Sequence, residues 1–98
     1  MHQHNPQNRV DELRFIIRRQ RQLRNLSQHQ VAERLGVTAE FITLVEAGRR
    51  RLHLDRVAAM ADALGLDPRP LCRLALQERA PSLHRVLFPQ SPAADWYI

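Results

Sequence analysis

The stretch "SQHQVAERLGVTAEFITLVEAGRRR", residues 27–51, places two short amphipathic segments on either side of Gly36 and ends in three arginines. Apolar residues recur at three- and four-residue spacing on both sides of this glycine, which predicts two helices. Gly36 can take the positive φ that ends the first helix and turns the chain sharply. Two helices joined this closely must cross at a fixed angle, so this stretch constrains the fold more than any other.

The residues around the turn satisfy the packing that such a crossing requires. Ala32 is small where the second helix has to cross the first. The positions that must seal the pair against a core are apolar: Val31, Leu35, Val37, Ile42 and Val45. Together with Gly36, all seven restricted positions fit, and this is the pattern of a helix-turn-helix, a motif that places its second helix in the DNA major groove. The alternative is a helical hairpin with no role in nucleic-acid binding.

The spacing of apolar residues and the presence of capping residues predict helices in the rest of the chain as well. We predict five helices, over about residues 10–24, 27–35, 38–47, 54–64 and 67–78. Ser27 and Gln30 have the spacing of a capping box, and Thr38 and Asp67 are suitable N-caps for later helices. Asn25 is suited to the left-handed conformation that ends the first helix.

The chain reads as one domain, because 98 residues support a single modest core and no linker divides them. The predicted fold class is all-α: a compact five-helix domain over residues 9–80, after a disordered lead-in at 1–8 and before a C-terminal extension at 81–98. Residues 82–88 have the pattern of one or two further helical turns. The apolar residues predicted to face the core from the first and fourth helices are Val10, Leu13, Ile16, Ile17, Leu23, Leu54, Val57, Ala58, Ala61 and Leu64.

The charge of the chain is compatible with a nucleic-acid partner without requiring one. The formal net charge is +5, and the sequence contains fifteen arginines and no lysine. Arginine suits phosphate recognition, so a polyanion such as DNA is one interpretation and a solvated surface is the other. The single cysteine, Cys72, allows no internal disulfide and is expected to be a buried, inert thiol. With no apolar membrane span and no signal peptide pattern, we expect a cytoplasmic protein.

The motif and its neighbours resemble a known family. The segments "LSQHQVAERLGV", "VEAGRRR" and "MADALGLDP" are similar to those of the lambda- and Cro-repressor-like helix-turn-helix regulators, also called the XRE type. The resemblance extends over about residues 10–78. It implies a lambda-repressor-like bundle of five helices, with the third helix in the major groove and the second across the backbone. It also implies twofold dimers on palindromic double-stranded DNA.

Carried onto this sequence, the resemblance implies specific DNA contacts. Gln28, at the start of the second helix, is expected to bond a phosphate, where a helix N-terminus already favours an anion. The residues expected to face bases or their flanking phosphates are Thr38, Ala39, Glu40, Thr43 and Leu44. Those expected to meet the backbone beyond the third helix are Arg49, Arg50 and Arg51, which follow Gly48. The resemblance further implies that Arg21 pairs with Glu46 and locks the third helix to the bundle.

The outward side of the third helix is unusual for a reader of DNA. Glu40 can accept a hydrogen bond from cytosine N4, and Ala39, Thr43 or Leu44 can touch a thymine methyl group. Phe41 either folds back onto the core or, with Leu44, forms an apolar surface that docks a protein. The alternative function is therefore a protein-docking module, such as an antitoxin or a phage-type regulator.

No enzyme, metal or cofactor site is evident, because the five histidines are scattered and no phosphate loop or nucleophile motif occurs. The extension is rich in apolar residues, which cover either the domain's own core or a second copy of the chain: Leu83, Val86, Leu87, Phe88, Trp96, Tyr97 and Ile98. We favour dimerisation, and predict a dimeric, sequence-specific transcriptional repressor with no cofactor and no small-molecule substrate.

Overall fold

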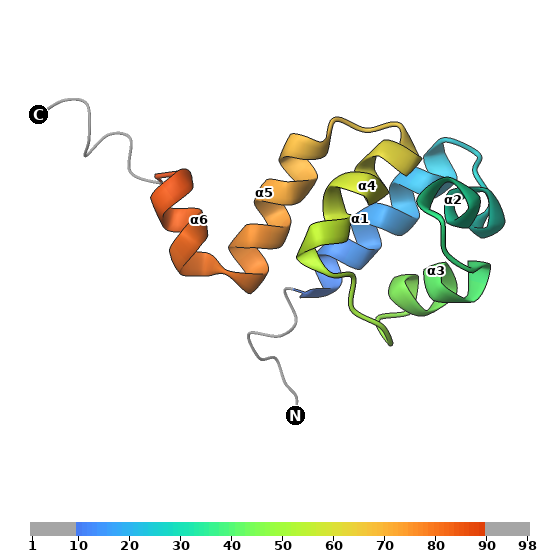
Figure 1. Ribbon diagram of the computed structural model, residues 1–98, viewed down its shortest axis with the longest axis horizontal. Helices are drawn as coiled ribbons and strands as arrows, with labels where there is room; N and C mark the ends of the chain where they lie inside the picture. The colour runs from blue at the N-terminus through green and yellow to red at the C-terminus, as the bar shows by residue number, and fades with distance from the viewer. Residues whose placement is uncertain (1–9, 90–98) are drawn as a thin grey trace, which may run out of the picture.

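The computed structural model describes residues 10–89, and this part of the chain is helical with no strands. Its elements are α1 (Val10–Leu23), α2 (Gln28–Leu35), α3 (Ala39–Glu46), α4 (Leu54–Leu64), α5 (Pro68–Arg79) and α6 (Pro81–Leu87). Figure 1 shows α1 to α5 gathered in one bundle, while α6 projects from the end of α5 on the side away from α2 and α3. The predicted all-α class is confirmed, and the turns expected at 82–88 form the sixth helix. The predicted lead-in at 1–8 and the apolar end at 96–98 lie outside the described residues.

The helix ends follow from local capping chemistry. Ser27 accepts a hydrogen bond from the Gln30 backbone N–H at 3.0 Å, and the Gln30 side chain accepts one from the Ser27 N–H at 2.8 Å, which forms the predicted capping box. Thr38 caps α3 through the Phe41 N–H at 3.1 Å. Asn25 adopts a φ of 57° after α1, as expected for a left-handed terminator.

Asp67 caps the last helix of the bundle and also carries an ion pair. Its carboxylate accepts from the backbone N–H of Arg69 at 3.0 Å and from the guanidinium of the same residue at 2.9 Å. These hydrogen bonds from the Arg69 side chain and backbone lower the pKa of Asp67 below its ordinary value. The predicted start of this helix is therefore confirmed by its cap.

The turn between α2 and α3 has the tight geometry that the sequence predicts. Gly36 has a φ of 79°, and its N–H donates to the Ala32 carbonyl at 2.8 Å, while the N–H of Val37 donates to the same carbonyl at 3.0 Å. Both bonds end on the Ala32 carbonyl, so the chain leaves α2 in a left-handed cap without another turn of helix. Since the Ala32 side chain is buried, α3 can follow at once and pack against α2.

The core lies at the centre of the bundle and draws on α1 to α5. Its buried apolar members are Leu13, Ile17, Val31, Ala32, Ile42, Val45, Leu52, Val57, Met60, Ala61, Ala63, Leu64, Leu71 and Ala75. The prediction for α4 was wrong at Leu54 and Ala58, which are exposed, while Met60 and Ala63 are buried in their place. The prediction for α1 was wrong at Leu23, which lies in the exposed last turn. Cys72 is a free thiol that is only partly buried at the edge of this core.

The sixth helix is fixed on one side only. His84 is buried, and its ring centroid lies 5.2 Å from that of Phe88. The guanidinium carbon of Arg73 on α5 lies 4.3 Å from the Phe88 ring centroid. The opposite side of α6 exposes Leu83, Val86 and Leu87 at helical spacing. These three side chains therefore do not cover the domain's own core, which was one of the two roles expected for them.

We expect side-chain truncation to destabilise the protein strongly at positions that the structure buries. At positions where only the sequence pattern predicted burial, we expect a small effect. Ile42→Ala lowers the free energy of unfolding by about 2–5 kcal/mol, because a fully buried side chain leaves a cavity. Leu54→Ala removes the same class of group from a side chain that is 39% exposed, so the change is about 1 kcal/mol or less. Urea unfolding of both variants measures the difference, and equal losses would contradict this assignment of the core.

Candidate DNA-binding surface

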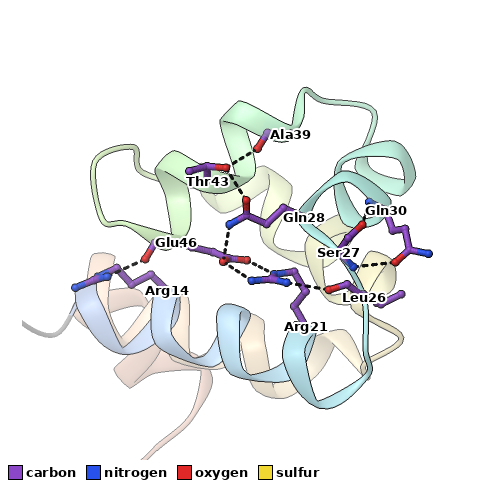
Figure 2. Close-up of polar contacts among 9 residues, drawn as sticks. All are labelled: Arg14, Arg21, Leu26, Ser27, Gln28, Gln30, Ala39, Thr43 and Glu46. Atoms are coloured by element: carbon purple, nitrogen blue, oxygen red, sulfur yellow. Dashed lines mark hydrogen bonds and ion pairs between the residues drawn. The ribbon is translucent and has the colours of Figure 1, made fainter.

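The orientation of α3 is fixed by one buried carboxylate. Glu46, at the end of α3, is only 4% exposed. The Arg21 guanidinium on α1 binds both of its oxygens, with Nε 2.6 Å from Oε2 and Nη2 3.0 Å from Oε1 (Figure 2). Arg21 also donates through Nη1 to the Leu26 carbonyl at 2.8 Å, which ties the start of the helix-turn-helix to the same group. The ion pair implied by the family resemblance is thus present in two-point form.

Gln28, at the start of α2, extends this network to the outer side of α3. Its amide Nε2 donates to Glu46 Oε1 at 3.0 Å, and its Oε1 accepts from the Thr43 hydroxyl at 2.7 Å (Figure 2). Sequence reasoning missed the contact with Thr43, because Gln28 was expected to bond only a phosphate. One Nε2 proton has no partner within residues 10–89 and remains able to donate to a phosphate.

A second arginine of α1 holds the C-terminal end of α3. Arg14 Nη1 donates to the Glu46 backbone carbonyl at 2.8 Å, which satisfies a carbonyl that the helix leaves open. Gly48 has a φ of 76°, and a Cβ at this position would lie 2.8 Å from Arg14 Nε. Gly48 is therefore favoured both by its backbone conformation and by the close approach of Arg14. The family resemblance identified the glycine, but it did not identify the arginine beneath it.

Of the predicted base-facing residues, Ala39 packs against the core, whereas Thr38, Glu40, Thr43 and Leu44 do not belong to the core cluster. Thr38, Glu40 and Thr43 are exposed, and Ala39 and Leu44 are partly buried. The structure therefore leaves this side of the helix accessible. Within residues 10–89, Glu40 forms no ion pair, so its carboxylate is not neutralised by a neighbouring arginine. Such a group can approach DNA only where it meets a hydrogen-bond donor.

Phe41 does not belong to the outer side of α3. It is partly buried and packs against the core. The guanidinium carbons of Arg50 and Arg56 lie 5.2 Å and 5.7 Å from its ring centroid, within the range of cation–π contacts. Of the two roles left open by the sequence, the structure has the ring folded back onto the core. The proposed docking surface of Phe41 and Leu44 is consequently narrower than the sequence implied.

The three arginines after α3 form a cationic loop. Arg49, Arg50 and Arg51 are all exposed, and none is paired with a carboxylate in the described part of the chain. A pocket of about 280 Å³ beside this loop is also lined by Arg14 and Arg79. These guanidinium groups concentrate positive charge next to the C-terminal end of α3.

Arg79 is affected by this concentration of charge. Burial lowers the pKa of Arg79, and the positive charge of Arg51 lowers it further, while Glu78 acts in the opposite direction. Its Nη1 donates to the Leu52 carbonyl, so Arg79 also holds the end of the cationic loop. Nothing in the local sequence pattern around residue 79 identified this contact.

The described residues also bear on two other kinds of site. Among residues 10–89, no group of three or more His, Cys, Asp or Glu side chains is placed to hold a metal ion. No helix in this part of the chain combines the length and apolar character that crossing a membrane requires.

A short helix pair at a fixed angle, an accessible second helix and an adjacent cationic loop define a helix-turn-helix protein that binds DNA. The sequence profile of the helix-turn-helix family matches residues 17–71, more than half of the chain. The chain belongs to this family, in its XRE-type branch, and is a DNA-binding regulator of transcription. Comparison with curated proteins and with solved structures gave no significant match.

The ion pair of Arg21 and Glu46 makes a testable contribution to stability. Arg21→Leu or Glu46→Leu alone lowers the free energy of unfolding by about 3 kcal/mol, because each leaves a charge without its partner in a poorly solvated site. The double variant costs clearly less than the sum of the two, since no charge is stranded. Urea denaturation measures all three.

Glu33→Ala is the matched control, because this glutamate is exposed on α2 and its loss changes stability by about 0.5 kcal/mol or less. Additive losses in the double variant would show that the two charges do not depend on each other.

Proposed function

We propose that this chain is a sequence-specific double-stranded DNA-binding repressor that acts as a dimer and reads the major groove with α3. The observation that carries the proposal is the combination of a rigidly held α3, open on its outer side, with three arginines unpaired by carboxylates at its end. A reading helix must be rigid, because base contacts require a fixed position relative to the phosphates. Occupying an operator is enough to block transcription, so this surface and the dimer contact described below suffice for the proposed repression.

The two groups of predicted contacts have different tasks. Arg49, Arg50 and Arg51, with Gln28 at the start of α2, hold the phosphate backbone and contribute affinity that does not depend on sequence. Thr38, Ala39, Glu40, Thr43 and Leu44 face the bases and set the preferred site. Glu40 disfavours phosphate and any acceptor on a base, so it selects against wrong sites as well as for cytosine N4.

Removing the arginine cluster tests the backbone role. We expect the triple variant Arg49→Ala, Arg50→Ala, Arg51→Ala to bind all duplexes more weakly. The slope of log K against log salt falls by about 0.9 for each arginine that neutralises a phosphate. Fluorescence anisotropy with a selected duplex and an unrelated duplex, over a salt series, measures both quantities.

A triple alanine variant at Arg19, Arg24 and Arg69 is the matched control, because it loses the same charge from exposed positions that belong neither to the predicted DNA contacts nor to α6 and its anchor. It keeps most of the affinity and of the salt slope. Equal losses in the two triple variants would show that the three arginines act only through the net charge of the protein, and would contradict direct contacts with phosphates.

The proposed dimer uses the exposed side of α6. Leu83, Val86 and Leu87 form an apolar row on a helix that is anchored to α5 by its opposite side. Val86, at 76% exposed, is the most open large apolar side chain of the described residues. A second copy of the same row is a self-complementary partner, as twofold dimers require.

Val86→Glu tests this interface. A carboxylate placed in a buried apolar contact raises the dimer dissociation constant by about tenfold or more, which is about 1.4 kcal/mol. Ser82→Glu adds the same charge to an exposed polar position of α6 and leaves dimerisation nearly unchanged. Sedimentation equilibrium measures both variants, and a monomeric wild-type protein or an unaffected Val86→Glu dimer would refute the interface.

The second candidate function is a docking module for another protein, such as an antitoxin. The row on α6 is the feature that favours it, because the Phe41 and Leu44 face is partly covered by Arg50 and Arg56. Docking on α6 would leave α3 free for DNA, but it would compete with the proposed dimer for the same apolar row.

A further inference from the structure

We infer that the Thr43 hydroxyl reads its base only as a hydrogen-bond acceptor, so that it selects an amino group: N6 of adenine or N4 of cytosine. This inference rests on the proposed function and specifies one element of it. A threonine hydroxyl can ordinarily donate or accept, so on its own it discriminates poorly between base edges. In this protein the hydrogen-bond network beneath α3 removes that ambiguity.

The network begins at Glu46. Its carboxylate is bound at both oxygens by Arg21 and offers only acceptors to its neighbours. The side-chain amide of Gln28 lies 3.0 Å from Glu46 Oε1. An amide can turn either its oxygen or its nitrogen toward a neighbour, but only its nitrogen can bond a carboxylate. Glu46 therefore fixes the orientation of the Gln28 amide, with Nε2 directed toward the carboxylate.

The orientation of Gln28 then determines the role of Thr43. With Nε2 toward Glu46, Oε1 faces the Thr43 hydroxyl at 2.7 Å. Because an amide oxygen only accepts, the hydroxyl must donate to it. The other group near this hydroxyl is the Ala39 carbonyl at 3.1 Å, which also only accepts. A hydroxyl has one proton, and either bond uses it within the protein.

What remains for DNA is the pair of lone pairs on Thr43 Oγ1. No donor within residues 10–89 uses them, and the residue is exposed on the open side of α3. In the major groove, only adenine N6 and cytosine N4 present donors. Guanine O6 and N7 and thymine O4 are acceptors. Placing any of them against Thr43 Oγ1 would bring two acceptors together with no proton between them. The network therefore converts an ambivalent side chain into a selective one.

Thr38 provides an internal contrast. It is the other exposed threonine of this surface, and its Oγ1 accepts from the Phe41 N–H as the cap of α3. Its proton and its second lone pair are not used within the described residues, so Thr38 can either donate to DNA or accept from it. Of the two hydroxyls, five residues apart, only that of Thr43 is therefore restricted to accepting.

The test measures the coupling between Thr43 and single atoms of DNA. Sites are first selected from random duplexes with the wild-type protein and with Thr43→Val, which keeps the shape of the side chain but lacks the hydroxyl. The base pair at which the variant loses its preference marks the position that Thr43 contacts. Thr43→Ser is the control that keeps the hydroxyl, and it retains the preference. Thermal unfolding verifies that all three proteins are equally folded.

Two modified duplexes then separate donors from acceptors at the marked base pair. One replaces adenine by purine, or cytosine by pyrimidin-2-one, which deletes the amino group. The other carries a 7-deazapurine, which deletes the N7 acceptor. We expect the loss of the amino group to weaken wild-type binding about three- to tenfold more than it weakens Thr43→Val binding. The 7-deaza duplex should affect both proteins equally. Comparing the two proteins cancels any change in the duplex itself.

Two outcomes overturn the inference while leaving the proposed function intact. One is coupling of Thr43 to the N7 acceptor instead of the amino group, which would mean that the hydroxyl donates to DNA. The other is a selected site that Thr43→Val prefers as strongly as the wild type does at every position. A folded wild-type protein that selects no sequence at all overturns the proposed function, and this inference with it.

Discussion

The buried carboxylate of Glu46 is the contact on which the arrangement of the first three helices depends. It joins Arg21 of α1, Gln28 of α2 and the end of α3 itself. A carboxylate removed from water needs these partners, and their hydrogen bonds are directional, whereas apolar contacts allow helices to slide. The apolar core therefore holds the helices together, and the ionic network selects one orientation among the packings that such a core permits. The outer side of α3 is therefore held in place by the Glu46 carboxylate on its inner side.

The helix ends were predictable because their causes are local. Ser27, Thr38 and Asp67 cap helices that begin at the next residue, and Gly36 ends α2 with hydrogen bonds that span only a few residues. The inward side of α4 was less predictable. Leu54 and Ala58 fit a helical stripe, but the helices that pack on α4 instead bury Met60 and Ala63. Which side of a helix faces inward is decided by distant segments, and spacing alone does not describe them.

The DNA-binding surface also has a part that was predictable from the sequence and a part that was not. The positions open to solvent on α3 were expected from the family pattern, but the hydrogen bonds behind them were not. Thr43 and Gln28 are 15 residues apart, and Arg14 and Glu46 are 32 apart. Each pair meets only because one rotamer of a long side chain reaches across a helix crossing. Such contacts carry no periodic signal, and Arg50 and Arg56 over Phe41 are a further case.

The separation between the fixed inner side of α3 and its open outer side also bears on how such a protein changes over generations. Glu40 makes no ion pair or tertiary hydrogen bond among residues 10–89, and Leu44 is only partly buried, so a lineage can replace either one while the scaffold stays intact, which under the proposed function would change the preferred DNA site. Thr43 is less free, because its hydroxyl is joined to Gln28 and through it to the carboxylate below. Under the proposed function, a change of preferred site should therefore occur first by substitution at residues 40 and 44. Residue 43 should change only together with Gln28 on α2.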